Sequence, residues 1–135
     1  MSIYNRNRVY TRLRTAVLAV NSNAFVASTY TPTPAKFPAV SIRQIGKVQP
    51  VQNVTLDHAD DQWRDTIEVQ VFSNKVGGAL TEAYRLMDAI EAEMKVLGYI
   101  LDMLQPIDNM DTTIFRLVGR WHRTTGGADQ MPTNN

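Results

Sequence analysis

One short segment of this 135-residue chain holds side chains that could bind a divalent metal ion. They are Asp57, His58, Asp60 and Asp61. An imidazole with nearby carboxylates is the ligand set of many metal-dependent hydrolases, but a catalytic zinc site draws a further histidine or cysteine from elsewhere in the fold. The chain has no cysteine, and its second histidine is His122. A solvated acidic loop explains the segment better, and we assign no metal, cofactor or catalytic residue.

The sequence also lacks the spacing of the common nucleophile and phosphate-binding motifs. No serine lies in a G-x-S-x-G turn, and neither histidine has the pattern of a base beside an orienting acid. The stretch SNKVGG, residues 73–78, has two glycines but does not complete the G-x-x-x-x-G-K-[ST] loop. A capped helix start, with Ser73 or Asn74 near the N-cap, explains it. We therefore expect a protein that is not an enzyme.

Four arginines near the start of the chain could neutralise phosphate groups, as in a DNA-binding module. They are Arg6, Arg8, Arg12 and Arg14. On a helix, Arg8 and Arg12 fall on one flank and Arg14 on the other, and the formal net charge of the chain is only +1. This dispersal disfavours specific DNA recognition. An exposed helical surface or a subunit contact is the favoured interpretation.

The elements that must position these residues follow from hydrophobic periodicity. Ile67, Val69 and Val71 alternate with polar residues, which predicts a strand with one buried face. From position 80 the apolar spacing becomes helical, and Gly98 supplies a stop. The apolar stripe of that helix comprises Leu80, Ala83, Tyr84, Met87, Ile90, Met94 and Leu97.

The remaining segments complete the expected order of elements. A first amphipathic helix runs from about Ser2 or Asn5 to Val20, with Val9, Leu13 and Val17 in its stripe. The segments that follow are a loop at 24–36 with alternating prolines, a strand at 37–46 that Pro38 opens, a long loop at 47–61, strands at 99–104 and 112–122, and a flexible tail at 124–135.

This order predicts a two-layer α+β domain, with two amphipathic helices on one face of a roughly four-stranded, mostly antiparallel sheet. The length suits a single domain over 1–123. The lack of cysteine fits folding in a reducing compartment. No apolar run approaches the ~20 residues of a membrane span. We therefore expect a soluble protein made in the cytoplasm, with no membrane partner.

The near-neutral net charge conceals a segregation along the chain. Seven basic and no acidic residues precede Asp57, a charge of +7, and thirteen acidic and seven basic residues follow from there, a charge of −6. Folding could interleave the two parts and mix the charges over the surface. Alternatively, the basic part of one subunit could meet the acidic part of its neighbour in a head-to-tail ring. The candidate interface residues are Arg6, Arg8, Arg12, Arg14, Arg43, Lys47, Asp57, Asp60 and Asp61.

Several stretches together resemble the tail terminator, or tail completion, proteins of long-tailed bacteriophages. They are FPAVSIRQIG at 37–46, RDTIEVQVFSN at 64–74, EMKVLGY at 93–99, PIDNMD at 106–111 and TTIFRLVGRWH at 112–122. The resemblance covers roughly residues 9–122 and lies in the order of elements and in these pieces, none of which is a catalytic motif.

The resemblance implies a structural virion protein at the head-proximal end of the tail. Members of that family form a ring, usually a hexamer, that docks on the last ring of the tail tube protein and ends polymerisation. The ring presents a surface to the head connector or neck protein, and phage DNA passes through its lumen without sequence-specific binding. A head completion or neck protein is the alternative from the same junction.

Overall fold

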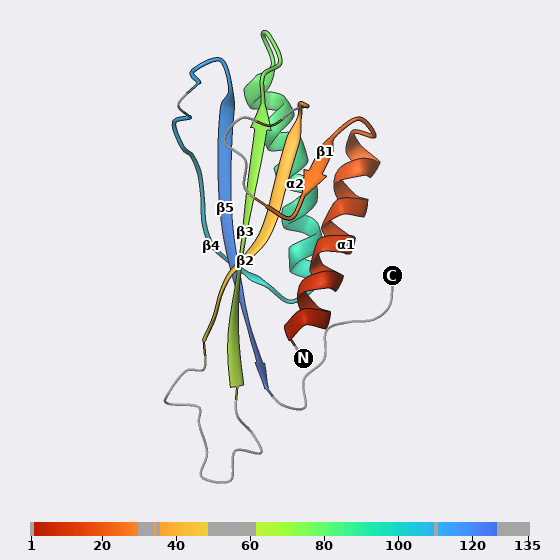
Figure 1. Cartoon of the computed structure of the whole chain (residues 1–135), viewed down its shortest axis with the longest axis vertical. Coiled ribbons are helices and arrows are strands. Elements are labelled where there is room, and N and C mark those ends of the chain that lie inside the picture. Colours follow the sequence, from red (N-terminus) through yellow and green to blue (C-terminus); the bar gives the residue numbers. More distant parts are fainter. Residues whose placement is uncertain (1, 30–33, 35, 49–61, 110, 127–135) are drawn as a thin grey trace.

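A computed structural model describes residues 2–29, 34, 36–48, 62–109 and 111–126, apart from the side chains of 2–6, 48, 62, 63, 125 and 126. Two helices and five strands lie in these ranges (Figure 1). In chain order they are α1 (Ser2–Val20), β1 (Phe25–Ala27), β2 (Ala39–Val48), β3 (Gln62–Ser73), α2 (Ala79–Val96), β4 (Ile100–Pro106) and β5 (Phe115–Gly126). The predicted α+β class is confirmed.

The strands form one sheet in the order β1-β2-β3-β5-β4. All neighbours are antiparallel except β1, which runs parallel to β2. Strand β3 occupies the centre and pairs with β5 along its whole length, from Gln62 opposite Gly126 to Ser73 opposite Phe115. Register shifts interrupt β2 between Gln44 and Gly46, and β4 between Leu101 and Met103.

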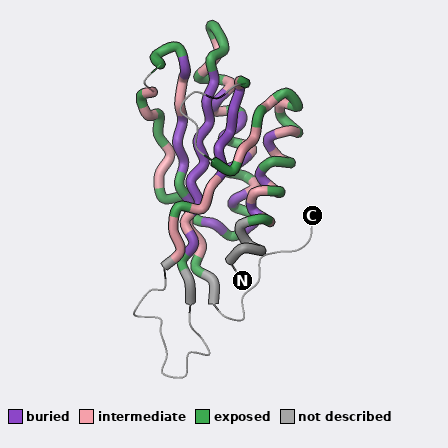
Figure 2. The backbone as a smooth tube through the Cα atoms, viewed as in Figure 1, coloured by how far each residue is buried: buried purple, intermediate pink, exposed green. Residues whose placement is uncertain are grey.

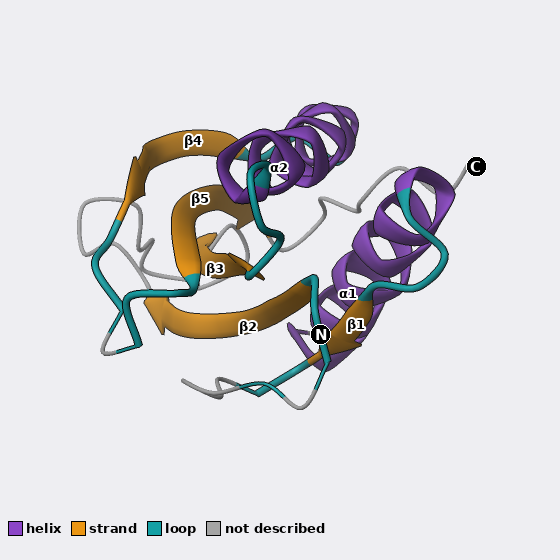
Figure 3. Ribbon diagram, turned by 90° about the horizontal axis from the view of Figure 1, so that it is seen from above, coloured by secondary structure: helices purple, strands orange, loops and turns teal. Residues whose placement is uncertain are grey.

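Both helices pack on the same face of this sheet, and their apolar stripes form the core with it (Figure 3). Helix α1 contributes Val9, Leu13 and Val17, which are fully buried as the periodicity predicts. The alternate positions of β3 that face the helices include Ile67 and Val69, and burial is concentrated along the central strands (Figure 2). We call this side the helix-covered face and the opposite side the helix-free face.

Helix α2 ends where the sequence predicts, but its N-cap differs from the predicted one. Gly98 has a φ of +86°, the left-handed conformation that favours glycine, and it follows the C-cap residue Leu97. At the other end the N-cap is Gly78, with no side-chain cap, so the prediction of Ser73 or Asn74 is wrong. Ser73 instead donates a 2.5 Å hydrogen bond to Glu82 Oε1.

The apolar stripe predicted for α2 is also wrong at one position. Leu80 lies in the first turn and is 56% exposed, whereas Leu86, which the stripe omits, is buried. A turn at 74–78 separates β3 from α2. The first turn of α2 lies close to this turn and contributes nothing to the described core cluster, which includes Ala83, Leu86 and Met87.

Three segment boundaries differ from the expected ones. Strand β1 lies in the segment predicted as a loop, because three residues are too short to show a strand period. Strand β2 runs from Ala39, directly after the cis Phe37–Pro38 peptide, to Val48, so it begins and ends later than the predicted strand at 37–46. Strand β5 continues to Gly126, which places Thr124–Gly126 in the sheet and corrects the predicted start of the tail. Residues 49–61 of the predicted long loop and 127–135 of the tail lie outside the described residues.

Candidate interaction surface

The helix-free face of the sheet carries a network of polar side chains on its three central strands. Sequence alternation predicts that Glu68 and Gln70 belong to the unburied side of β3, yet they are only 3% and 2% exposed. That prediction is wrong, because long side chains from the neighbouring strands cover both. Arg43 on β2 and Arg120 on β5 stand directly opposite Glu68 in the sheet register.

Glu68 is the centre of this network. Arg43 donates to Glu68 Oε1 from Nη2 at 2.9 Å and from Nε at 3.3 Å, and Gln70 Nε2 donates to the same oxygen at 2.8 Å. Arg120 Nε donates to Oε2 at 2.9 Å. The carboxylate therefore has hydrogen-bond partners on both oxygens, as a buried charge requires.

Two opposing effects set the pKa of Glu68. Burial raises it, while the hydrogen bonds from Arg43, Gln70 and Arg120 and the charge of Arg120 lower it, and the net pKa lies below the ordinary carboxyl value of 4.5. Glu68 is therefore ionised at neutral pH and holds two guanidinium groups in place.

The network continues along the sheet through Gln70. Arg116 Nε donates to Gln70 Oε1 at 2.8 Å, so one chain of hydrogen bonds joins Arg116, Gln70 and Glu68. Beyond it a small apolar cluster of Phe37, Ala39, Phe72 and Ile114 covers the adjacent part of the same face. The polar chain and the apolar cluster fix the side chains of this face in defined positions.

A separate side-chain contact lies at the β4 edge of the sheet. Asp102 is the extra residue at the register shift of β4, and its Oδ1 is 2.6 Å from Nδ1 of His122 on β5. Within the described part of the chain, no group of three or more histidine, aspartate or glutamate side chains is arranged to hold a metal ion. The predicted metal-ligand types at 57–61 lie outside the described residues.

The helix-covered face has its own buried carboxylate, Asp65. Gln44 Nε2 donates to Asp65 Oδ1 at 3.0 Å, and Lys47 and Arg123 lie near enough for their charges to act on it. Burial outweighs these contacts and raises the pKa of Asp65 above its ordinary value of 3.8. Nearby Tyr99 is also buried, and desolvation is the main cause that raises its pKa.

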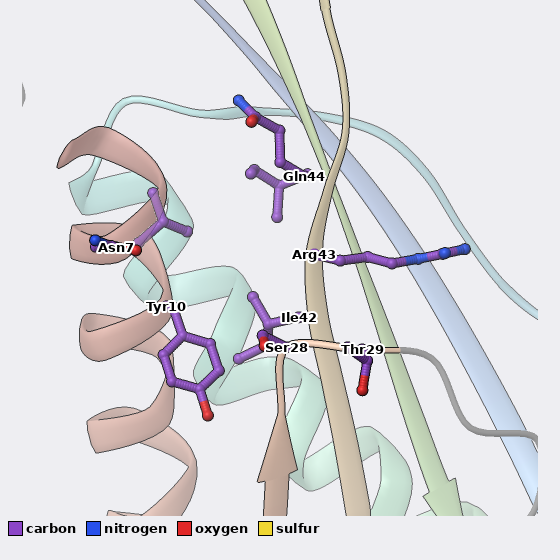
Figure 4. A pocket seen from close by; sticks show the side chains of 9 residues that line it. Asn7, Tyr10, Ser28, Thr29, Ile42, Arg43 and Gln44 are labelled. Carbon is purple, nitrogen blue, oxygen red and sulfur yellow. The ribbon is translucent and has the colours of Figure 1, made fainter. Parts of the chain in front are cut away.

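A cleft of about 560 Å³ separates α1 from β2 (Figure 4). Val9, Ile42 and Ile67 form its apolar part, and polar side chains that include Asn7 and Tyr10 line the rest. Arg43 belongs to the lining but extends away from the other labelled side chains (Figure 4). No acid or histidine lies among the lining residues of this cleft, so they do not provide a carboxylate or imidazole base.

The structure distributes the candidate interface residues over several surfaces. Arg12 Nε donates at 2.6 Å to Glu93 Oε2 on α2, so this arginine joins the two helices within one subunit. Arg14 is exposed on α1, and Arg8 is partly exposed. Arg43 and Lys47 lie on β2, close to Glu68 and Asp65 respectively. The side chains of Arg6, Asp57, Asp60 and Asp61 lie outside the described residues.

These contacts bear on the charge segregation. Arg12 with Glu93, and Arg43 with Glu68, each join a residue of the basic front to one of the acidic remainder inside the same chain. For these two pairs, the basic and acidic parts of the chain therefore meet inside one subunit. Sequence reasoning missed Glu68, Arg116 and Arg120 as members of one site, since only the strand order brings β2, β3 and β5 together.

Comparisons with known proteins were made for sequence and for structure. No family model matches the sequence, and no curated protein matches it. A chain from the virion of a native gene transfer agent particle matches with a TM-score of 0.64 and 13% sequence identity, over 88% of this chain and 92% of that chain. The two chains therefore share a fold over most of their length.

A second structure is similar to a lesser degree. It is the sheath/tube terminator of an extracellular contractile injection system, PVC, in the extended state, with a TM-score of 0.44 and 8% identity, over 94% of this chain and 60% of that chain.

In the described part of the protein, neither helix is long and apolar enough to cross a membrane.

Proposed function

We propose that this chain is a structural virion protein that caps the phage tail tube as a ring, ends tail polymerisation and forms the interface for head attachment. The observation that carries the proposal is the fold shared with a gene transfer agent virion chain over nearly all of both chains. The sequence resemblance to tail terminators supports a place in the tail. The ring is a hexamer, located at the head-proximal end of the tail.

Ring formation needs two different contact surfaces on each subunit, because a closed head-to-tail ring joins unlike faces. The outer side of α1, with Arg14 and Arg8, is one candidate. The β4 edge of the sheet is another, since it exposes Ile100 and Leu101, which are 60% and 38% exposed. Sheet edges and exposed apolar side chains are common sites of association.

The test is electron microscopy of the purified full-length protein, alone and mixed with purified tail tubes that lack their terminator. We expect rings on one end of each tube and no further elongation when free tube protein is added. A protein that neither forms a ring nor associates with tubes would refute the proposal.

A charge-reversal variant tests the α1 surface without disturbing the interior. Arg14→Glu changes an exposed residue, whereas Arg12 would be a poor choice because it pairs with Glu93. We expect Arg14→Glu to reduce ring formation while circular dichroism stays unchanged. Arg85→Glu, at an exposed position of α2, is the matched control. Equal assembly of both variants and the parent protein would exclude Arg14 from the interface.

A head completion or neck protein is the second candidate, because the matching gene transfer agent chain is described as part of a virion and not by its position in it. The binding partner distinguishes a tail terminator from a head completion protein. A terminator associates with tail tubes, whereas a head completion protein associates with DNA-filled heads and leaves tube length unaffected. Substitution of His58 and Asp61 with alanine, with metal uptake as the readout, tests the remaining hydrolase alternative.

A further inference from the structure

The helix-free face carries more positive than negative charge. The described strand residues on this face include four arginines and two carboxylates, a surplus of +2. The arginines are Arg43, Arg64, Arg116 and Arg120, and the carboxylates are Glu68 and Asp102. Because Asp102 is paired with His122 and Glu68 is buried, the exposed part of the face is dominated by guanidinium groups.

Two of these guanidinium groups are held in place but remain accessible. The side chains of Arg43 and Arg120 are 41% and 49% exposed, although both bond to the buried carboxylate of Glu68. Arg120 donates this hydrogen bond from Nε, so the bond does not use its two Nη groups. A guanidinium that is already oriented loses less side-chain entropy when it binds an oxyanion, and its planar fork matches a phosphate.

The arrangement has the dimensions of a polymer site. Arg43 and Arg120 lie on either side of β3 in one row, so their backbones are about 10 Å apart. Along the strands, Arg116 on β5 lies opposite Phe72 on β3, and Arg64 precedes Phe72 by eight residues on β3. The backbones of Arg64 and Arg116 are therefore about 27 Å apart along the strand direction. Charges spread over such a length suit an extended polyanion better than a single small anion.

An acidic surface on a second copy is the competing partner, but most of the described carboxylates are buried, paired within the subunit or interspersed with basic residues. Glu68 and Glu93 are engaged in ion pairs inside the subunit, Asp102 contacts His122, and Asp65 is buried. The exposed acids of α2, Asp88 and Glu91, alternate with Arg85 and Lys95, and two further exposed acids, Asp108 and Asp111, lie in the connection between β4 and β5. The observations therefore favour a partner from outside the chain.

We propose that the helix-free face contacts the phosphate backbone of a nucleic acid, independently of base sequence, through Arg43, Arg64 and Arg120. The inference deepens the proposed function, because a ring around DNA needs a surface that faces it, and it identifies that surface.

The test is the affinity of the full-length protein for a short labelled DNA duplex of mixed sequence, measured by fluorescence anisotropy over a range of salt concentrations. Removal of one phosphate contact lowers the slope of log affinity against log salt by about one unit. We expect this change for Arg64→Gln, which alters an exposed residue, and for Arg120→Gln. Arg85→Gln on α2, a helix of the opposite face, is the matched control and should bind as the parent protein does.

The outcomes are distinct. A parent protein without DNA affinity, or Arg64→Gln and Arg120→Gln variants that bind like Arg85→Gln, would overturn the inference. Variants that change self-association but not DNA affinity would assign the face to a second copy instead. Capping of tail tubes by the parent protein is measured in parallel. If the parent caps tubes and the variants bind DNA as the parent does, the proposed function stands and the inference is wrong. If the variants bind DNA more weakly and the parent does not cap tubes, the inference stands and the proposed function is wrong.

Discussion

Replacement of Glu68 by glutamine is the most direct test of the network on the helix-free face. Glutamine has nearly the same shape but no charge, and it turns an amide group toward guanidinium donors that need acceptors. The parent carboxylate accepts hydrogen bonds from Arg43, Gln70 and Arg120 and is almost fully buried. The substitution therefore removes the centre of the network without creating a cavity.

The magnitude follows from the exposure of the partners. Breaking a fully buried ion pair costs about 3–5 kcal/mol. Here Arg43 and Arg120 are 41% and 49% exposed, so water solvates them when the carboxylate is lost. We expect a loss of about 2 kcal/mol in the free energy of unfolding, which corresponds to a fall in Tm of about 7 °C for a domain of this size.

The assay is thermal unfolding followed by circular dichroism, with Glu91→Gln as the matched control at an exposed position of α2. The control should stay within about 0.5 kcal/mol of the parent. Because the pKa of Glu68 is lowered in the folded state, its contribution is present above pH 4.5 and is lost as the pH falls through the folded pKa. The difference between parent and Glu68→Gln should therefore shrink in acid. If both glutamine variants unfold at the same temperature at neutral pH, the network does not stabilise the fold.

Three further experiments test other parts of the structure. Burial raises the pKa of Asp65, so Asp65→Asn should be neutral or raise the unfolding free energy by up to about 1 kcal/mol at neutral pH. That advantage should disappear as the pH is lowered through the folded pKa to below 3.8. Gly119→Ala would place a Cβ 2.6 Å from two ring carbons of Trp121, and overpacking of this kind should cost about 2–3 kcal/mol in chemical denaturation. A double-mutant cycle with Arg12→Gln and Glu93→Gln should give a coupling free energy of about 1 kcal/mol, since the pair is mostly buried.

Each of these results has a clear contrary outcome. A strongly destabilised Asp65→Asn variant would mean that the charges of Lys47 and Arg123 outweigh desolvation. Unchanged stability of Gly119→Ala would mean that the Trp121 ring moves aside at no cost. Additive effects of the Arg12 and Glu93 substitutions would mean that this ion pair does not stabilise the packing of α1 on α2.

Much of the fold could be predicted because single elements show their period in the sequence. The stripe of Val9, Leu13 and Val17 and the alternation of Ile67 and Val69 reported buried faces correctly. The period does not predict how far the side chains on the opposite face are buried, because that depends on which side chains the neighbouring strands place over them. Glu68 therefore looked solvated, although it is buried.

The candidate site depended on strand order, which no local pattern contains. Arg43, Glu68 and Arg120 are brought together only because β3 lies between β2 and β5. The charge segregation left two alternatives open for the same reason, since a sequence does not show that residues far apart along the chain, such as Arg12 and Glu93, are neighbours in space. The contact roles predicted for Arg6, Arg8 and Arg14 remain predictions.

The packing of α1 on α2 has a consequence for how the chain folds during synthesis. Arg12 and Glu93 are separated by 81 positions, and the apolar stripe of α1 is buried largely against elements that are made after it. While the ribosome extends the chain, Val9, Leu13 and Val17 have no complete surface to cover them. Formation of the core must wait for most of the sequence, so folding depends on long-range contacts and is slow compared with a local helical bundle. Helix α1 is thus synthesised before most of the surface that buries it.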